Sequence, residues 1–260
     1  MSDEAFDYGR LLVLQHVDWA GPGSLVETLD GRANKRPWDL VDTPTAGVPA
    51  LTEAVRGILV LGGPMSVHDD DGWIADEKAL IAAAVEAGVP VLGICLGTQL
   101  LAEATGGTVT RRDEVALGFS DLSRTTEAAD DEIFAGWVDG SLGFFSHEWE
   151  VATLPPGAVP MLAGHNGAAP AYRLADGLSY GVQFHAEILP ATLEDWLSRE
   201  RGQRMAAAVG RTPEDLADEA RRRDRFTRAA GVSLVGRWID GVVGRQDPTP
   251  RRERQPRPAA

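Results

Sequence analysis

The sequence predicts an α/β fold in which an open, mostly parallel, doubly wound sheet is flanked by helices, with a helical C-terminal extension. Short apolar runs at residues 11–14, 57–61 and 90–94 lack polar alternation, which is typical of strands covered on both faces. Helical patterns follow these runs, and the segment from residue 212 to residue 243 is mostly helical in pattern. Alternation of this kind favours a parallel sheet with helices on its two faces.

The clearest helix is predicted between the second and third apolar runs. Asp76 can cap its first turn, apolar residues recur at helical spacing between residues 80 and 85, and Gly88 can end it. A strand, a helix and a strand of these lengths make a right-handed βαβ unit. A second helix is expected immediately afterwards, over residues 96–104, before the pair Gly106-Gly107.

The later elements are less regular in pattern. We expect a strand at residues 143–147 that ends in a loop, and another strand at residues 178–184. In the helical segment, Thr212 can cap the N-terminus, Pro213 suits the first helical position, and Asp215 completes a capping box.

Three parts of the chain are expected from these patterns. An α/β domain covers residues 1–200, and a helical extension packed on it covers residues 201–244. Residues 245–260 hold five Arg and four Pro with almost nothing to bury, which predicts a disordered basic tail.

The composition argues against several classes of protein. The formal net charge of −14 disfavours general nucleic-acid binding. No apolar stretch approaches the roughly 18 to 20 residues that span a bilayer, and the acidic first residues do not resemble a signal peptide. The single Cys cannot form an intramolecular disulfide. We therefore expect a cytoplasmic protein without nucleic-acid or membrane partners, and we predict no cofactor and no metal.

The only cysteine lies in a pattern that favours a nucleophile. Residues 93–97 read Gly-Ile-Cys-Leu-Gly, which places Cys95 between a predicted strand and a predicted helix. This spacing matches the nucleophile elbow, a strained turn that exposes the reactive side chain. The helix N-terminus favours a thiolate, and the N–H of Leu96 is available to a developing oxyanion. The alternative, a small buried hydrophobe, is usual for a free Cys but does not account for the spacing.

A second oxyanion donor is predicted at the end of another strand. Gly62 and Gly63 directly follow the run at residues 57–61, and two glycines let backbone N–H groups approach a ligand closely. A plain strand-to-loop turn is the alternative at this position.

Of the five histidines, His185 is the best placed to act as a base. It follows a predicted strand, as site residues do in open α/β sheets. Glu187 lies two residues on, and in extended chain such side chains point to the same side, so its carboxylate can orient the imidazole. A core histidine with a backbone partner is the alternative. His68, beside the acidic residues 69–71, is expected in a solvated loop instead of a metal site.

Three motifs, in this order, resemble those of the class I glutamine amidotransferases, the triad family that cuts the side-chain amide of glutamine. They are GGPMSV at residues 62–67, GICLGTQ at residues 93–99 and GVQFHAE at residues 181–187, and Ser146-His147 resembles a fourth. Within this family the chain looks most like the glutaminase part of GMP synthase and its stand-alone relatives.

The resemblance implies a role for each of the following residues. It implies a triad of Cys95, His185 and Glu187, oxyanion donors at Gly63 and Leu96, and substrate contacts at Met65, Gln99, Ser146 and His147. It further implies glutamine or another γ-glutamyl compound as the substrate, and a separate synthase subunit as the partner that takes the ammonia.

The sequence departs from the family pattern in three places. Ala186 replaces the Pro of a usual His-Pro-Glu, Glu148-Trp149 replaces a frequent Gly-Asp, and no ATP-binding synthetase motif follows. An inward-pointing Glu148 would repel the α-carboxylate of glutamine, and Trp149 could stack on an extended substituent. Alternatively, both side chains point outward.

Three functions stay open at this point. One is an amidotransferase subunit that feeds ammonia to a separate synthase, and another is a stand-alone γ-glutamyl peptide or amide hydrolase. Both would proceed through a thioester on Cys95. The third is a non-catalytic binding or regulatory protein on the same fold, which the intact motifs disfavour.

Overall fold

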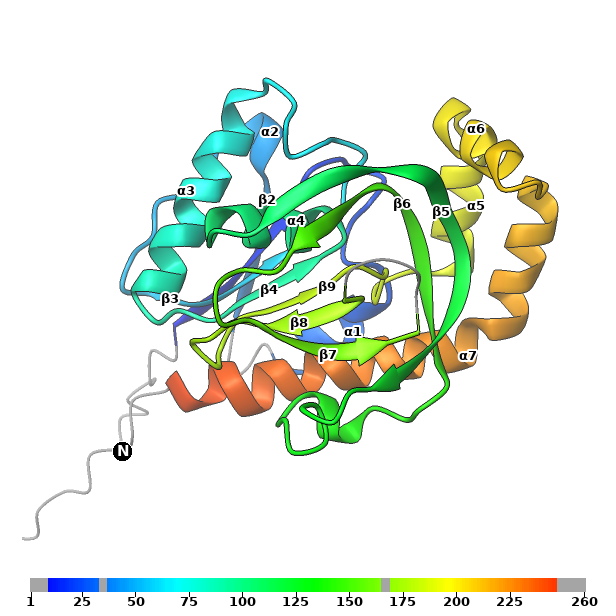
Figure 1. The fold of residues 1–260 in the computed structure, drawn as a ribbon. Coiled ribbons are helices and arrows are strands. Elements are labelled where there is room, and N and C mark those ends of the chain that lie inside the picture. The colour runs from blue at the N-terminus through cyan, green and yellow to red at the C-terminus, as the bar shows by residue number, and fades with distance from the viewer. Residues whose placement is uncertain (1–8, 33–36, 165–168, 247–260) are drawn as a thin grey trace, which may run out of the picture.

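The structure of the chain is a computed structural model that describes residues 9–32, 37–164 and 169–246. Within these residues the chain forms a nine-stranded sheet in the order β2-β1-β3-β4-β9-β8-β7-β5-β6, flanked by helices (Figure 1). The strands are β1 (Arg10–Gln15), β2 (Trp38–Asp42), β3 (Val55–Val60), β4 (Val91–Ile94), β5 (Thr108–Arg124), β6 (Ser141–Thr153), β7 (Val159–Ala163), β8 (Ala171–Arg173) and β9 (Tyr180–Val182). The α-helices are α1 (Val26–Asp30), α2 (Thr43–Ala46), α3 (Gly72–Glu86), α4 (Leu96–Ala104), α5 (Pro190–Ser198), α6 (Glu200–Ala208) and α7 (Pro213–Arg237), and short helical turns are η1 (Gly23–Leu25), η2 (Phe134–Gly136), η3 (Trp238–Val242) and η4 (Val243–Gln246).

One half of the sheet is parallel, and it positions the site. Strands β2, β1, β3, β4 and β9 are neighbours in this order and all pair in parallel. The carboxyl ends of parallel strands meet at one edge, so the segments that follow them converge there. His16 follows β1, Gly62 lies just beyond β3, Cys95 follows β4, and His185 lies just beyond β9. The predicted α/β fold is confirmed in this half.

The other half makes the sheet mixed, because residues 108–173 supply strands that pair antiparallel. The strand predicted to end at residue 147 continues as β6 to Thr153. It does so because the long strand β5 keeps pairing with it beyond His147, at Trp149↔Arg111 and Val151↔Val109. The expectation of a loop after residue 147 is therefore wrong.

Two other boundaries differ from the sequence-based expectation. Helix α3 begins at Gly72, and Asp71 instead of Asp76 occupies its N-cap position. The helix starts earlier because Ile74 is buried against the sheet, so its apolar face begins before Asp76. Strand β9 covers only the middle of the strand predicted over residues 178–184. Helix α4 has the predicted bounds.

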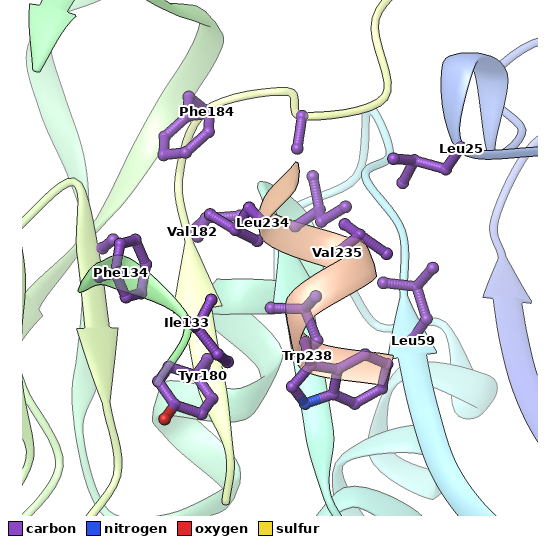
Figure 2. Packing of buried hydrophobic residues seen from close by; sticks show 14 of the residues in the cluster. Leu25, Leu59, Ile133, Phe134, Tyr180, Val182, Phe184, Leu234, Val235 and Trp238 are labelled. Atoms are coloured by element: carbon purple, nitrogen blue, oxygen red, sulfur yellow. The ribbon is translucent and has the colours of Figure 1, made fainter. Parts of the chain in front are cut away.

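The parallel strands are buried on both faces, as their apolar runs predict. Alternate residues of β1 and β3 belong to two separate hydrophobic clusters, one on each face of the sheet. Helices α3 and α4 cover one face, and the end of α7 with η3 covers the other. Figure 2 shows Leu234, Val235 and Trp238 from this end packing among Leu59 and Val182 of the strands. The C-terminal helical segment thus contributes to the main core.

The start of α7 agrees with the predicted cap. The Thr212 hydroxyl accepts a hydrogen bond from the Asp215 N–H at 3.1 Å, and Pro213 is the first helical residue. Helices α5 and α6 and the first turns of α7 pack together with β6 in a third cluster, around Phe144 and Ile188.

The predicted tail is only partly described. Arg245 lies in η4 and pairs with Glu132 at 2.6 Å, so the predicted disorder does not begin at residue 245. Residues 247–260 of that tail lie outside the described residues. The division at residue 200 stays a prediction.

Candidate active site

Cys95 occupies the turn between β4 and α4. Its φ of 52° is the one positive φ of a non-glycine residue in the described part of the chain. A Cβ at Gly93 would collide with the Gly97 carbonyl, and a Cβ at Gly97 would collide with the Val60 carbonyl. The glycine spacing therefore lets β3, β4 and α4 approach closely enough to hold Cys95 in this strained conformation.

His185 and Glu187 lie beside this turn, just beyond β9. The His185 Nδ1 and a Glu187 carboxylate oxygen are 2.6 Å apart, and both side chains are buried. The contact does not arise from extended chain, as the sequence argument assumed, because residues 186 and 187 form a turn. Ala186, in place of the family Pro, is compatible with that turn.

Two neighbouring side chains, Cys95 and Glu187, act on the buried imidazole of His185. Burial favours the neutral ring and by itself lowers the pKa of His185, but the charges and hydrogen bonds of Cys95 and Glu187 outweigh it and raise this pKa to about 10. At neutral pH the imidazole therefore carries a proton. The arrangement places one imidazolium between a sulfur and a carboxylate.

The Gly62-Gly63 turn after β3 faces the same groups. A Cβ on Gly62 would lie 2.9 Å from Cε1 of His185 and 3.4 Å from the Cβ of Cys95. Gly63 packs against the side chain of Leu96, the first residue of α4. The glycine backbone of this turn and the N-terminus of α4 therefore lie next to each other beside Cys95.

A cavity of about 290 Å³ opens beside His185. One side is formed by Gly63, Ser146 and His185, from three different strand ends or strands of the sheet. The other side comes from the segment after β1 and from α5 and α6, with Trp196 and Met205 in its wall. Through this cavity a small molecule can reach the buried pair of His185 and Glu187.

Of the four residues predicted to contact the substrate, Ser146 is the one found among the described residues that line this cavity. Its carbonyl oxygen lies 4.0 Å from the Cys95 Sγ. Gln99 is buried, and its amide donates to the Trp149 carbonyl at 2.7 Å and to Gln183 at 3.2 Å. The structure does not bring Gln99 to the cavity wall.

The other two predicted substrate contacts also lie elsewhere. His147 is buried next to Ser146 on β6, and its Nδ1 donates to the Trp149 carbonyl at 2.8 Å. Met65 packs at the edge of the cluster between the sheet and helices α3 and α4. Neither residue is among those that line the cavity.

Glu148 is not an isolated charge. Its carboxylate lies 3.2 Å from Arg201 and 3.6 Å from Arg204, both in α6, and 3.8 Å from Arg111 in β5. Three cations offset the carboxylate, so the repulsion of a substrate carboxylate that an unpaired Glu148 would exert is not expected. The pairing instead holds α6 against β6.

Trp149 does not line the cavity, so it is not in a position to stack on a substrate there. Its ring meets His68 edge-on at 5.2 Å between centroids, and it packs against the cluster under α3 and α4. The aromatic residues in the cavity wall are Trp19 and Trp196 instead. No motif marks these two residues, because they approach the site from segments that are distant in the sequence.

Helix α6 is tied to the glycine turn as well. The Arg201 guanidinium donates to the Pro64 carbonyl and pairs with Glu148.

Within the described residues there is no group of three or more His, Cys, Asp or Glu side chains that could hold a metal ion. His68 contacts Glu103 at 2.7 Å on the surface. In the same part of the chain, no helix combines the length and apolar character needed to cross a membrane.

The chain is similar to known sequences of one family. The class-I glutamine amidotransferase family matches residues 32–200. The GMP synthase (glutamine-hydrolyzing) of Latilactobacillus sakei subsp. sakei (strain 23K) is 31% identical over 150 residues, which are 58% of this chain and 28% of that protein. The GMP synthase (glutamine-hydrolyzing) of Acetivibrio thermocellus is 34% identical over 134 residues, 52% of this chain and 25% of that protein. The chain thus spans only about a quarter of the length of these curated relatives.

Solved structures extend the likeness over most of the chain. A glutamine amido transferase from Methylobacillus flagellatus is 27% identical and superposes with a TM-score of 0.80, over 95% of this chain and 99% of that one. A glutamine amidotransferase from Thermotoga maritima, 23% identical, shares the fold with a TM-score of 0.77 over 90% of this chain and 99% of that one. With the family match covering more than half of its length, the chain belongs to the class-I glutamine amidotransferases and is like the glutaminase domain of GMP synthase.

Proposed function

We propose that this chain hydrolyses the side-chain amide of glutamine with Cys95 as nucleophile, His185 as proton carrier and Glu187 as the group that orients it. The observation that carries the proposal is the convergence of three groups at one sheet edge. A strained cysteine turn, a histidine with its carboxylate 2.6 Å away, and a glycine turn meet beside an open cavity. Each group alone has structural explanations, but their juxtaposition matches the requirements of acyl transfer.

The first half of the reaction forms a thioester. The sulfur of Cys95 attacks the amide carbon, and the carbonyl oxygen becomes an oxyanion stabilised by the N–H groups of Gly63 and Leu96. When the tetrahedral intermediate collapses, the C–N bond breaks and His185 gives its proton to the departing nitrogen. Ammonia leaves, and the glutamyl group stays on the sulfur.

The second half restores the enzyme. Water attacks the thioester carbon while His185 accepts a proton from it, the same oxyanion donors act again, and the C–S bond breaks to release glutamate. Glu187 accepts a hydrogen bond from Nδ1 of His185 and so stabilises the imidazolium. Ser146 lies at the cavity wall, where it can contact the amino-acid end of the substrate.

The ammonia is proposed to serve a separate synthase. In the GMP synthases that match this chain, the matching segment is about a quarter of the whole protein. A synthase subunit supplied by another chain would complete such a system, as the resemblance to glutaminase domains suggests.

A second candidate is the stand-alone hydrolysis of larger γ-glutamyl amides, and one observation favours it. Because His185 protonates the departing nitrogen, any substituent on that nitrogen must lie on the His185 side of the site. There Trp196 meets the His185 ring edge-on at 4.8 Å, and Trp19 lies 6.1 Å from Trp196. An aromatic wall of this kind suits an apolar or aromatic amine better than ammonia.

A substrate panel tests the proposal and separates its two versions. Ammonia or amine and glutamate are both measured for glutamine, γ-glutamyl peptides and γ-glutamyl anilides, with the Cys95→Ala protein as the blank. Equal release of ammonia and glutamate from glutamine supports the glutaminase. A much higher kcat/KM for the substituted amides supports the second candidate. The absence of Cys95-dependent turnover across the panel would overturn both.

A further inference from the structure

A second histidine–carboxylate pair lies behind the glycine turn and takes no part in the proposed proton transfers. His16, just beyond β1, places its Nε2 2.9 Å from a Glu77 carboxylate oxygen and its Nδ1 3.0 Å from the Gly62 carbonyl oxygen. Both side chains of the pair are completely buried. The His16 ring also stacks on Trp73 at 5.2 Å, one helical turn before Glu77 in α3.

The donor and acceptor inventory of these groups fixes one proton. A carbonyl oxygen only accepts hydrogen bonds, so Nδ1 of His16 must carry a proton and donate it to Gly62. This holds whether the proton shared at Nε2 sits on the ring or on Glu77. The second carboxylate oxygen of Glu77 is buried without a hydrogen-bond partner in the described structure, so the pair is shielded from other donors.

The Gly62 carbonyl belongs to the same peptide unit as the Gly63 N–H. This peptide is trans, so the C=O and the N–H point in opposite directions across one rigid plane. A hydrogen bond that holds the carbonyl toward His16 therefore fixes the N–H on the other side. Neither glycine has a side chain to hold this plane, and without an external donor a Gly-Gly peptide can rotate at low cost.

We propose that His16 and Glu77 are positioning residues that hold the Gly62–Gly63 peptide so that its N–H stabilises the oxyanion. This inference deepens the proposed function and depends on it. The pair polarises the peptide as well, because a hydrogen bond to the carbonyl makes the N–H of the same unit a stronger donor. Neither His16 nor Glu77 touches the substrate in this account.

The test compares two double variants that differ by one hydrogen-bond donor. In His16→Phe with Glu77→Leu, the ring stack on Trp73 is kept and no buried charge is left unpaired, but the donor to Gly62 is lost. In His16→Asn with Glu77→Leu, the side-chain amide can reach the Gly62 carbonyl in place of Nδ1. Thermal unfolding of both proteins checks that each is folded.

The Phe variant is expected to lose about 10- to 100-fold in kcat with KM within about twofold, because the oxyanion exists only in the transition state and intermediates. The Asn variant is expected to regain most of that loss. Alkylation of Cys95 by iodoacetamide forms no oxyanion, so its rate should stay within about twofold in both variants. Inhibition by the aldehyde analogue of glutamine, which forms a tetrahedral adduct, should weaken in step with kcat.

Unchanged kcat in the folded Phe variant would overturn this inference while leaving the proposed function standing. The same holds if kcat and alkylation fall together, because the pair would then support the Cys95–His185 dyad or the fold. If the natural protein shows no Cys95-dependent turnover, the proposed function fails, and with it the role of His16.

Discussion

The two sides of the cavity differ in origin. The side that carries the proposed chemistry comes mainly from strand ends of the parallel half, where Cys95, His185 and the Gly62 turn meet, and Ser146 of β6 adds to it. The opposite side comes largely from α5 and α6, with Trp196 and Met205 in its wall. Helix α6 is held in place by ion pairs between Glu148 and its arginines.

The two sides of the cavity meet two different requirements: the fixed geometry of the reacting groups and the recognition of the leaving group. Acyl transfer requires fixed geometry within about half an ångström, and strand ends of a buried sheet supply it. Recognition of the leaving group requires only a wall of suitable shape and polarity, and surface helices can supply that with many sequences. Substitutions on the two sides should therefore act differently on kcat and on substrate preference.

The largest effect on kcat is expected at the edge of the sheet where the carboxyl ends of the parallel strands meet. Cys95→Ala should lower kcat by at least about 10⁴-fold, because the covalent route disappears, while the midpoint of thermal unfolding stays close to that of the natural protein. Initial rates of glutamate formation and a thermal melt check this prediction. Residual turnover near the natural level would place the nucleophile elsewhere.

Removal of the Glu187 carboxylate should lower the rate less than removal of the His185 imidazole. Glu187→Gln is expected to lower kcat by about 10²- to 10³-fold, and His185→Ala by more, because the orienting group assists a proton carrier that is still present. Steady-state kinetics at saturating substrate compare the two. Equal losses would contradict the assigned roles.

The pH dependence of kcat gives a second test of the roles of His185 and Glu187. The pKa of His185 is raised to about 10, so the protonated imidazole that is proposed to protonate the departing nitrogen is present up to that pH and is lost above it. Glu187 helps to raise this pKa, so Glu187→Gln should move the alkaline fall of kcat to lower pH. A fall that stays at the same pH would show that another group controls it.

The helical side should change selectivity more than chemistry. Trp196→Ala is expected to lower kcat/KM for aromatic γ-glutamyl amides about tenfold relative to glutamine, because the ring beside His185 is removed. The ratio of the two kcat/KM values is the measurement. Trp149→Ala serves as the control, since Trp149 lies outside the cavity wall, and an equal change in both variants would count against the assignment.

The smallest effect is expected at Glu148. Glu148→Gln keeps the size of the side chain and removes the charge that pairs with Arg201, which is partly exposed, and with Arg204, which is exposed. We expect KM to rise by about two- to threefold with little change in kcat, because such pairs contribute about 1 kcal/mol or less. A large fall in KM for glutamine would restore the idea that Glu148 repels the substrate.

Much of the parallel half could be predicted because its signals are local. The G-x-C-x-G spacing places Cys95, and the bounds of α4 follow from an apolar pattern between clear stop signals. His185 could be placed by its strand end, although the turn that brings Glu187 to it could not. The functional roles of these residues stay predictions that the experiments above test.

The helical side could not be predicted because its contacts are distant in sequence. Glu148 meets Arg201 only after the chain has passed through three further strands and α5. The pairing of β5 with β6 beyond His147 likewise depends on a polar strand that carries no apolar run. The His16–Glu77 pair joins two elements 61 residues apart, and neither residue lies in a motif.

The most direct measurement is the mass of the enzyme during turnover. Rapid acid quenching of the reaction with glutamine, followed by intact-mass and peptide analysis, should show one glutamyl group on the peptide that contains Cys95, the only cysteine of the chain. The same adduct should be absent in Cys95→Ala. A glutamyl group on another residue, or glutamate formed at full rate while no adduct accumulates on Cys95 even when a glutamine-like diazoketone is used to trap it, would contradict the central claim.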